Sequence, residues 1–302
     1  MIGVITLVLA GSSSVEWLPA NYENTWTLGG PVFRKGICLH SGEESEVTLL
    51  PSEEIGFYIS WVNSSDPPIK LKPNQVVNSH LCTALVLGER RVSTVEHLLA
   101  ALAGCGLTHV QILLSGNEIP LLDGSSIEWV EGIREAGMVP LNISNTNFPE
   151  INKSFVINKG SSIITATPSD SLNLIGIIDF PYPAIGKQIF SLELNPRSFY
   201  KEIAPARTFG FKDQIDHLIK SGLIKGGDLN NSLVCDGESW VNPPLRFKDE
   251  PVRHKLLDLI GDLALIGLPK AQVLVYRGSH ALHAELAKSL SRECSLTKYY
   301  FD

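Results

Sequence analysis

The chain has 302 residues, of which 44% are hydrophobic and 19% are charged, and its formal net charge at pH 7 is −7. This balance is typical of a globular protein with a full hydrophobic core, arranged as one large or two medium domains. The acidic net charge argues against nucleic acid as a partner, because the chain has no basic excess to neutralise phosphates.

The cysteines and the start of the chain indicate the compartment. Five cysteines are scattered without a CxxC pair, which predicts reduced thiols and a cytoplasmic protein. No apolar run approaches the roughly 20 residues that a transmembrane helix needs. The sequence MIGVITLVLAG is a poor signal peptide, because it has no basic residue before its short apolar run. We therefore expect residues 1–20 to be a weakly specified N-terminal extension.

The first half of the chain predicts an α+β domain over residues 21–140. Residues 25–50 are expected to form two strands joined by a glycine-containing turn that carries His40. Further strands are expected at 56–61 and 108–115, and helices at 93–104 and 127–137.

The predicted helix at 93–104 (STVEHLLAALAG) begins with Ser93 as N-cap and Glu96 three positions on, which is the spacing of a capping box. Glu96 therefore has a structural interpretation as well as a chemical one. His97 beside it has two interpretations too: a buried helix histidine, or a metal ligand.

The second half predicts another α+β domain over residues 154–302, after a linker at 141–153 that is rich in Asn, Ser and Pro. Strands are expected at 154–158, 161–168, 173–180, 188–194, 232–235 and 271–276, and helices at 212–221, 253–267 and 281–290. Both halves thus run through several strands, a helix with a histidine, a strand, a loop and a helix. This repeated order predicts two domains of similar topology, each a layered sheet-and-helix unit, with helices packed between them.

The predicted helix RHKLLDLIGDLALIG (253–267) carries the strongest chemical signal. His254, Asp258 and Asp262 recur at i, i+4 and i+8, so they share one face. A histidine and a carboxylate one turn apart can hold zinc. The alternative interpretation is the polar stripe of an amphipathic helix.

Together with His97, His254 and Asp258 form a two-histidine, one-carboxylate set that leaves a fourth zinc position open. Glu96 could then accept a proton from water, and His280, in a glycine-containing loop, could donate one to a leaving amine. Asp262 could orient His280. Spacing alone does not show that these residues meet.

At this point the chain resembles a known family, the UDP-3-O-acyl-N-acetylglucosamine deacetylases, which are zinc amidases of lipid A synthesis. The resemblance runs from about residue 24 to about residue 290. It rests on the motifs GICLHSG (36–42), STVEHLLAAL (93–102), EIPLLDGSS (118–126), ARTFGF (206–211), GLIKGG (222–227), LRFKDEPVRHKLLDLIGDLALIG (245–267) and GSHALH (278–283).

The resemblance implies Zn²⁺ held by His97, His254 and Asp258. It implies Glu96 as general base, His280 as cationic acid supported by Asp262, and Thr208 as the hydroxyl that stabilises the oxyanion. It places Lys255 near the nucleotide phosphates. It also implies an apolar passage for the substrate's acyl chain, formed by Phe209, Phe211, Ile215 and Leu218. The alternative role of these four side chains is core packing.

The implied reaction is hydrolysis of the N-acetyl amide of a nucleotide-sugar glycolipid, by a monomer that needs no organic cofactor. Contact with a membrane surface, where such a substrate would be met, stays open. Two rival hypotheses are a zinc amidase for another acylated nucleotide sugar or glycolipid, and a non-catalytic nucleotide-sugar-binding protein.

One residue departs from the family, which usually has glycine where Cys38 stands. A positive φ there would strain a cysteine, so we assign no role to His40 in the neighbouring turn.

Overall fold

The computed structural model describes residues 17–19, 21–141 and 149–293. Its first sheet has the order β10 (Met138–Leu141), β1 (Thr25–Leu28), β9 (His109–Leu114), β3 (Glu44–Pro51) and β2 (Val32–Ile37). Strand β4 (Gly56–Trp61) runs parallel to β9, and β5 (Ile69–Lys70) pairs with β4. Alternate residues of β3 are buried, as expected for a strand with one face on the core.

The second sheet has the order β11 (Phe155–Lys159), β12 (Ser162–Pro168), β18 (Ala271–Tyr276), β13 (Asn173–Asp179) and β14 (Lys187–Glu193). Strand β18 is central, antiparallel to β12 and parallel to β13. In both sheets the central strand comes just after a long helix and just before another, so the two units share their order of elements.

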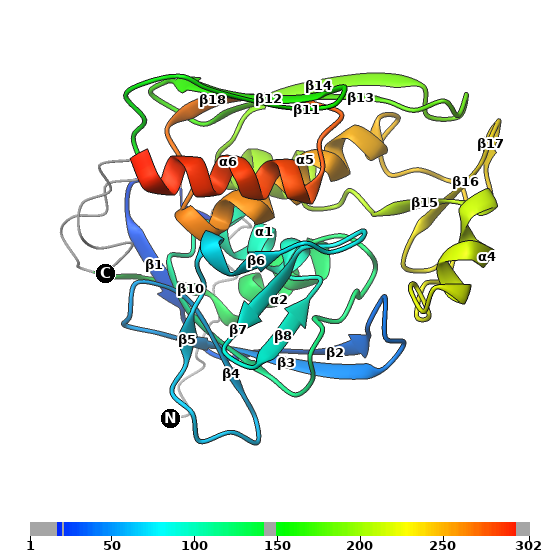
Figure 1. The fold of residues 1–302 in the computed structure, drawn as a ribbon. Coiled ribbons are helices and arrows are strands. Elements are labelled where there is room, and N and C mark those ends of the chain that lie inside the picture. Colours follow the sequence, from blue (N-terminus) through cyan, green and yellow to red (C-terminus); the bar gives the residue numbers. More distant parts are fainter. Residues whose placement is uncertain (1–16, 20, 142–148, 294–302) are drawn as a thin grey trace, which may run out of the picture.

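Four helices lie between the sheets (Figure 1): α1 (Glu96–Gly104), α2 (Ile127–Ala136), α5 (Glu250–Leu263) and α6 (His280–Glu293). Helix α1 packs across α5, and α5 also contacts α6 and β13. All nine residues of α1 are buried. The expected α+β architecture, with two similar units and helices packed between them, is confirmed.

Smaller elements flank these layers. The 3-10 turn η1 (Pro73–Gln75) precedes a three-stranded sheet of β6 (Val76–Val77), β7 (Ala84–Leu87) and β8 (Arg90–Ser93), which leads into α1. A second group projects to one side (Figure 1), formed by β15 (Phe209–Phe211), α4 (Lys212–Lys220), β16 (Leu233–Asp236) and β17 (Ser239–Trp240). The short helices α3 (Pro196–Ser198) and η2 (Phe199–Ile203) precede this group, and η3 (Ala264–Ile266) follows α5.

Two local predictions are wrong. Residues 25–50 form three strands, because Gly29, Gly30 and Pro31 separate β1 from β2 and β1 pairs with β10 instead. The capping box does not form: Ser93 ends β8, Thr94 has a φ of 60°, and α1 begins only at Glu96. The Glu96 carboxylate therefore does not cap the N-terminus of α1.

The domain boundaries stay predictions. Strand β10, which the sequence did not predict, ends at Leu141, the first residue of the expected linker, and residues 142–148 lie outside the described part. Most of the expected extension at 1–20 lies outside it too. The described cysteines (Cys38, Cys82, Cys105 and Cys235) are buried free thiols. Over the described ranges, none of the helices combines the length and hydrophobicity that crossing a bilayer requires.

Candidate metal centre

The crossing of α1 and α5 brings His97 from the first half of the chain against His254 and Asp258 from the second. Asp258 Oδ1 lies 3.4 Å from His254 Nε2 and 3.7 Å from His97 Nε2. The two imidazole rings stand edge to face, with centroids 5.0 Å apart. One potential ligand atom from each residue falls within 4.8 Å of the others, and all three side chains are buried. The structure therefore brings the predicted ligand set together.

Neighbouring groups hold these side chains in the forms that bind a metal. His254 Nδ1 lies 3.0 Å from the carbonyl oxygen of Ala206, which places the proton on Nδ1 and leaves the Nε2 lone pair facing Asp258. Burial lowers the pKa of His254 to about 3. Burial opposes ionisation of Asp258, but Lys255 and His254 hold its pKa well below the usual range. A neutral imidazole and a carboxylate fit zinc, and three protein ligands is the number found in catalytic zinc sites.

Glu96 lies beside the metal centre, next to His97 in sequence. Its Oε2 accepts a hydrogen bond of 3.0 Å from the backbone N–H of Thr83, and its Oε1 lies 3.8 Å from His280 Nε2. Burial raises the pKa of Glu96, although His280 and His97 act against it. A carboxylate of raised pKa between the metal ligands and a histidine is suited to accept a proton.

His280 is the first residue of α6 and is 16% exposed. Its Nδ1 lies 3.0 Å from both Asp262 Oδ2 and Thr83 Oγ1. Burial alone would lower the pKa of His280, but the carboxylates of Asp262 and Glu96 outweigh it and raise the pKa to about 9. His280 is therefore a cation at neutral pH, with Nε2–H directed toward Glu96.

Sequence reasoning missed two partners of Asp262. Thr83 Oγ1 donates to Asp262 Oδ1, and His283 Nδ1 lies 2.9 Å from Asp262 Oδ2. His283 could have been found, because it lies three residues after His280 and so shares its helix face. Nothing in the sequence pattern singles out Thr83, which comes from the loop before β7.

Thr208 lies two residues after the carbonyl that holds His254. Its backbone N–H donates to the carbonyl oxygen of Gly124 (2.7 Å), and its own carbonyl accepts from Leu233 N–H (2.8 Å). A Cβ on Gly124 would come within 2.0 Å of the Asn231 carbonyl oxygen, so only glycine permits this approach. The backbone at Thr208 is thus fixed near the metal centre, and its hydroxyl's role stays a prediction.

Phe209 joins the metal centre to an aromatic cluster. Its ring centroid is 6.3 Å from that of His254, 5.6 Å from Phe180 and 6.0 Å from Phe211. The Lys255 ammonium, which donates to Asp258 Oδ2 at 2.8 Å, lies 5.5 Å from the Phe209 ring. Lys255 and Phe209 are therefore direct neighbours of the candidate metal ligands Asp258 and His254.

Ile215 and Leu218 lie farther out. They are partly buried on α4, which packs on β15 and β16 at the side of the molecule (Figure 1). Gly222, with a φ of 81°, follows this helix, as the sequence predicted. Ile215 and Leu218 thus lie on the helix that packs beside Phe209 and Phe211 of β15, and their place in an acyl passage stays a prediction.

Position 38 does not require a positive φ, so the cysteine there is not strained. Positive φ falls on Gly42 in this turn and not on Cys38, whose Sγ donates to the Glu118 carbonyl at 3.3 Å. The Glu118 carboxylate accepts the backbone N–H groups of His40 and Ser41. The turn is therefore held by Glu118, and a cysteine is accommodated without distortion.

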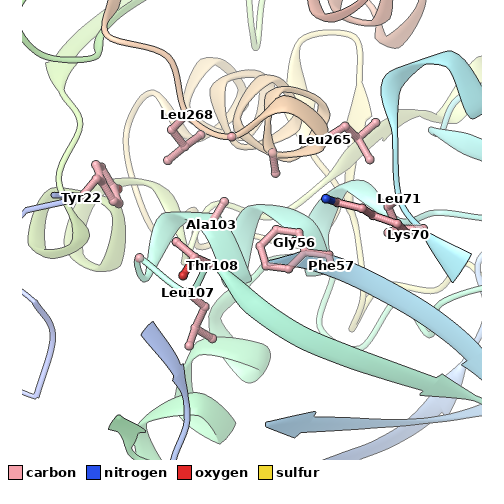
Figure 2. A pocket seen from close by; sticks show the side chains of 13 residues that line it. Tyr22, Gly56, Phe57, Lys70, Leu71, Ala103, Leu107, Thr108, Leu265 and Leu268 are labelled. Atoms are coloured by element: carbon pink, nitrogen blue, oxygen red, sulfur yellow. The ribbon is translucent and has the colours of Figure 1, made fainter. Parts of the chain in front are cut away.

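A separate small cavity lies at the far end of α1 (Figure 2). Its lining includes Tyr22, Phe57, Lys70, Ala103, Leu265 and Leu268. None of the predicted site residues lines it. The predicted site residues Glu96 and His97 lie at the opposite end of α1.

Residues 25–292 match the model of the family described as UDP-3-O-acyl N-acetylglycosamine deacetylase. The chain belongs to this family. It is 47% identical over 273 residues, 87% of this chain and 97% of the relative, to the UDP-3-O-acyl-N-acetylglucosamine deacetylase of Trichormus variabilis. For the protein of the same name from Thermosynechococcus vestitus, identity is 45% over 88% of this chain and 94% of the relative.

A plant relative is more distant. The Arabidopsis thaliana protein named "Probable UDP-3-O-acyl-N-acetylglucosamine deacetylase 1, mitochondrial" is 38% identical over 88% of each chain. The family resemblance predicted from the motifs is confirmed. Deacetylases of this family are zinc-dependent amidases, and the buried His97, His254 and Asp258 provide a donor set that fits zinc.

Proposed function

We propose that this chain deacetylates UDP-3-O-acyl-N-acetylglucosamine at the crossing of α1 and α5, as an early step of lipid A biosynthesis. One observation carries the proposal for the site. His97 from one half of the chain meets His254 and Asp258 from the other, beside Glu96 and His280.

His97, His254 and Asp258 would hold the zinc ion. When bound, zinc supplies Lewis acidity, which makes water a better nucleophile at neutral pH and polarises the amide carbonyl. Lys255 stabilises the ionised form of Asp258. The carbonyl of Ala206 keeps the His254 ring oriented toward this set.

Glu96 and His280 divide the proton transfers. Glu96 accepts a proton from the attacking water as the C–O bond forms at the amide carbon. Thr208 stabilises the negative charge that develops on the amide oxygen. His280 then donates its Nε2 proton to the leaving nitrogen as the C–N bond breaks, so the products are acetate and a free amine. The 3.8 Å separation of Glu96 Oε1 and His280 Nε2 supports the assignment of base and acid to the same reacting amide.

The nucleotide and the acyl chain of the substrate would contact different residues beside the metal centre. Lys255 would contact the nucleotide phosphates. Phe209 and Phe211 would begin the acyl passage, and Ile215 and Leu218 on α4 would continue it. The aromatic chain from His254 through Phe209 to Phe211 supports this direction.

We further propose that the protein works as a cytoplasmic monomer without a nucleic-acid partner. The net charge of −7 supports the absence of a nucleic-acid partner, and the buried free thiols support a reducing compartment.

Metal analysis of the purified protein tests the function. We expect about one zinc per chain, loss of deacetylation on chelation, and recovery on adding zinc back. The variants His97→Ala, His254→Ala and Asp258→Ala should lose zinc and activity but keep the wild-type circular dichroism spectrum. His217→Ala, on the exposed face of α4, is the control that should keep both.

Two results would contradict the proposal. Protein that carries no metal and is indifferent to chelation would favour a non-catalytic nucleotide-sugar-binding protein. A faster reaction with another member of a panel of acylated UDP-sugars would favour a zinc amidase with a different substrate.

A further inference from the structure

The Asp262 carboxylate accepts three side-chain hydrogen bonds in the described structure. Oδ1 accepts from Thr83, and Oδ2 lies 3.0 Å from His280 Nδ1 and 2.9 Å from His283 Nδ1. Asp262 is 2% exposed, so its orientation is decided by these partners rather than by water. Two imidazoles thus share one carboxylate oxygen, although only His280 faces Glu96.

His283 is buried more deeply than His280. It is 1% exposed, and its ring centroid lies 6.1 Å from that of His280. Its Nε2 has no hydrogen-bond partner among the residues that the structure describes. A Cβ on Gly278 would lie 2.7 Å from this Nε2, so glycine at 278 makes room for the ring.

This arrangement identifies the tautomer of His283. An ionised carboxylate only accepts, so the proton must be on Nδ1. A second proton on Nε2 would be a buried donor without an acceptor, which is costly. His283 Nδ1–H therefore donates to Asp262 Oδ2, the oxygen that also faces His280 Nδ1, and so fixes the orientation of the carboxylate.

We propose that His283 is a positioning residue for the deacetylation reaction: it holds the Asp262 carboxylate so that Oδ2 stays aligned with His280 Nδ1. The inference rests on the proposed function only in the role that it gives to His280. Misplacing a catalytic group by about 1 Å can cost roughly 100-fold in rate, so a residue that only orients another can have a large effect on kcat.

Nitrogen-15 NMR of the histidines in zinc-free protein tests the tautomer directly. We expect His283 Nδ1 to carry a proton that is hydrogen-bonded to Asp262. A ring protonated at Nε2 alone would overturn the proposal. This readout needs no substrate, so it stands even if the proposed deacetylase activity fails.

Two matched variants test the positioning. His283→Asn keeps an N–H close to the position of Nδ1, whereas His283→Leu removes the donor and keeps an apolar side chain of similar size. We expect His283→Leu to lower kcat about tenfold with little change in KM, and His283→Asn to recover most of that loss. Thermal unfolding and zinc content, measured for both, verify that they fold and load alike.

Three outcomes would contradict this role: wild-type kcat in His283→Leu, equal loss in the two variants, or a rise in KM with kcat unchanged. Equal loss would assign His283 to packing. If wild-type protein shows no deacetylation at all, the proposed function fails. A loss of kcat that is confined to His283→Leu tests only the role of His283.

Discussion

Gly261 of α5 lies directly against the backbone of Glu96 at the start of α1. A Cβ at position 261 would come within 2.1 Å of the Glu96 carbonyl oxygen. Asp262 follows Gly261 directly, and Asp258 lies three residues before it. This contact between two helices therefore sets how far Glu96 and His97 stand from the polar face of α5.

Gly261→Ala should separate these helices, because the methyl group would meet backbone, which cannot move aside as a side chain can. We expect a loss of about 3 kcal/mol in the free energy of unfolding, together with weaker zinc binding. Urea denaturation and competition with a chelator measure the two effects. Gly30→Ala is the control, because the nearest atom to a Cβ there is 4.0 Å away; equal stabilities for the two variants would contradict the close-contact argument.

The pKa of His280 predicts a pH dependence of stability in the zinc-free protein. The folded-state pKa of about 9 lies above the ordinary value of 6.5. Protonated His280 therefore stabilises the fold fully below pH 6.5, and this contribution is lost as pH rises to about 9. Deacetylation should also fall as His280 loses its proton, because the neutral ring cannot act as the acid.

Asp262→Asn should lower the pKa of His280, since Asp262 is the largest of the groups that raise it. NMR titration of the His280 ring gives its pKa, and urea denaturation between pH 6 and pH 9.5 gives the stability. A His280 pKa that stays near 9 in the variant would show that Asp262 is not its main stabilising charge. His280→Ala at the wild-type rate would remove His280 from the mechanism.

Lys255→Gln should separate two roles of this lysine. The ammonium binds Asp258 Oδ2 and is proposed to contact the nucleotide phosphates. If it binds the nucleotide, KM for the UDP-linked substrate should rise about tenfold, as expected for loss of a charged contact, with little effect on an analogue without the nucleotide. If activity falls equally for both substrates and zinc affinity is lower, Lys255 acts only through Asp258.

Phe209→Ala should weaken binding of long acyl chains more than short ones. The Phe209 ring lies between His254 and the aromatic cluster, where a passing chain would contact it. We expect the ratio of kcat/KM for long-chain over short-chain substrate to fall at least fivefold, by loss of apolar contact. Ile215→Ala should act in the same direction, and Ile219→Ala, whose side chain is 49% exposed, is the control. A ratio unchanged in Phe209→Ala would leave core packing as its role.

The hydrophobic periodicity predicted the helices that carry the site, but it did not predict that these helices pack against each other. The helical spacing of Leu256, Leu257 and Ile260 correctly predicted α5 and its buried face. His254 and Asp258 could be paired because they lie one turn apart. His97 is far away in sequence, and its approach depends on the packing of α1 on α5, which no local pattern encodes.

The errors have local physical causes. Glu96 has the spacing of a capping box, yet the positive φ of Thr94 delays the helix start, and the carboxylate binds the Thr83 N–H instead. Tertiary contacts override the local preference here. Thr83 was missed because it has no periodic partner, and its contacts with Asp262 and His280 exist only after folding.

The described cysteines affect how the zinc content can be measured. Burial raises the pKa of Cys38 and Cys82 to about 11, and burial also raises the pKa values of Cys105 and Cys235. At pH 7 about one in ten thousand Cys38 or Cys82 side chains is therefore a thiolate, the form that oxidises and binds metals. These four sulfurs should neither compete for added zinc nor need a reducing agent for protection, so they give no reason to add a thiol, which would strip the ion, when stoichiometry is measured.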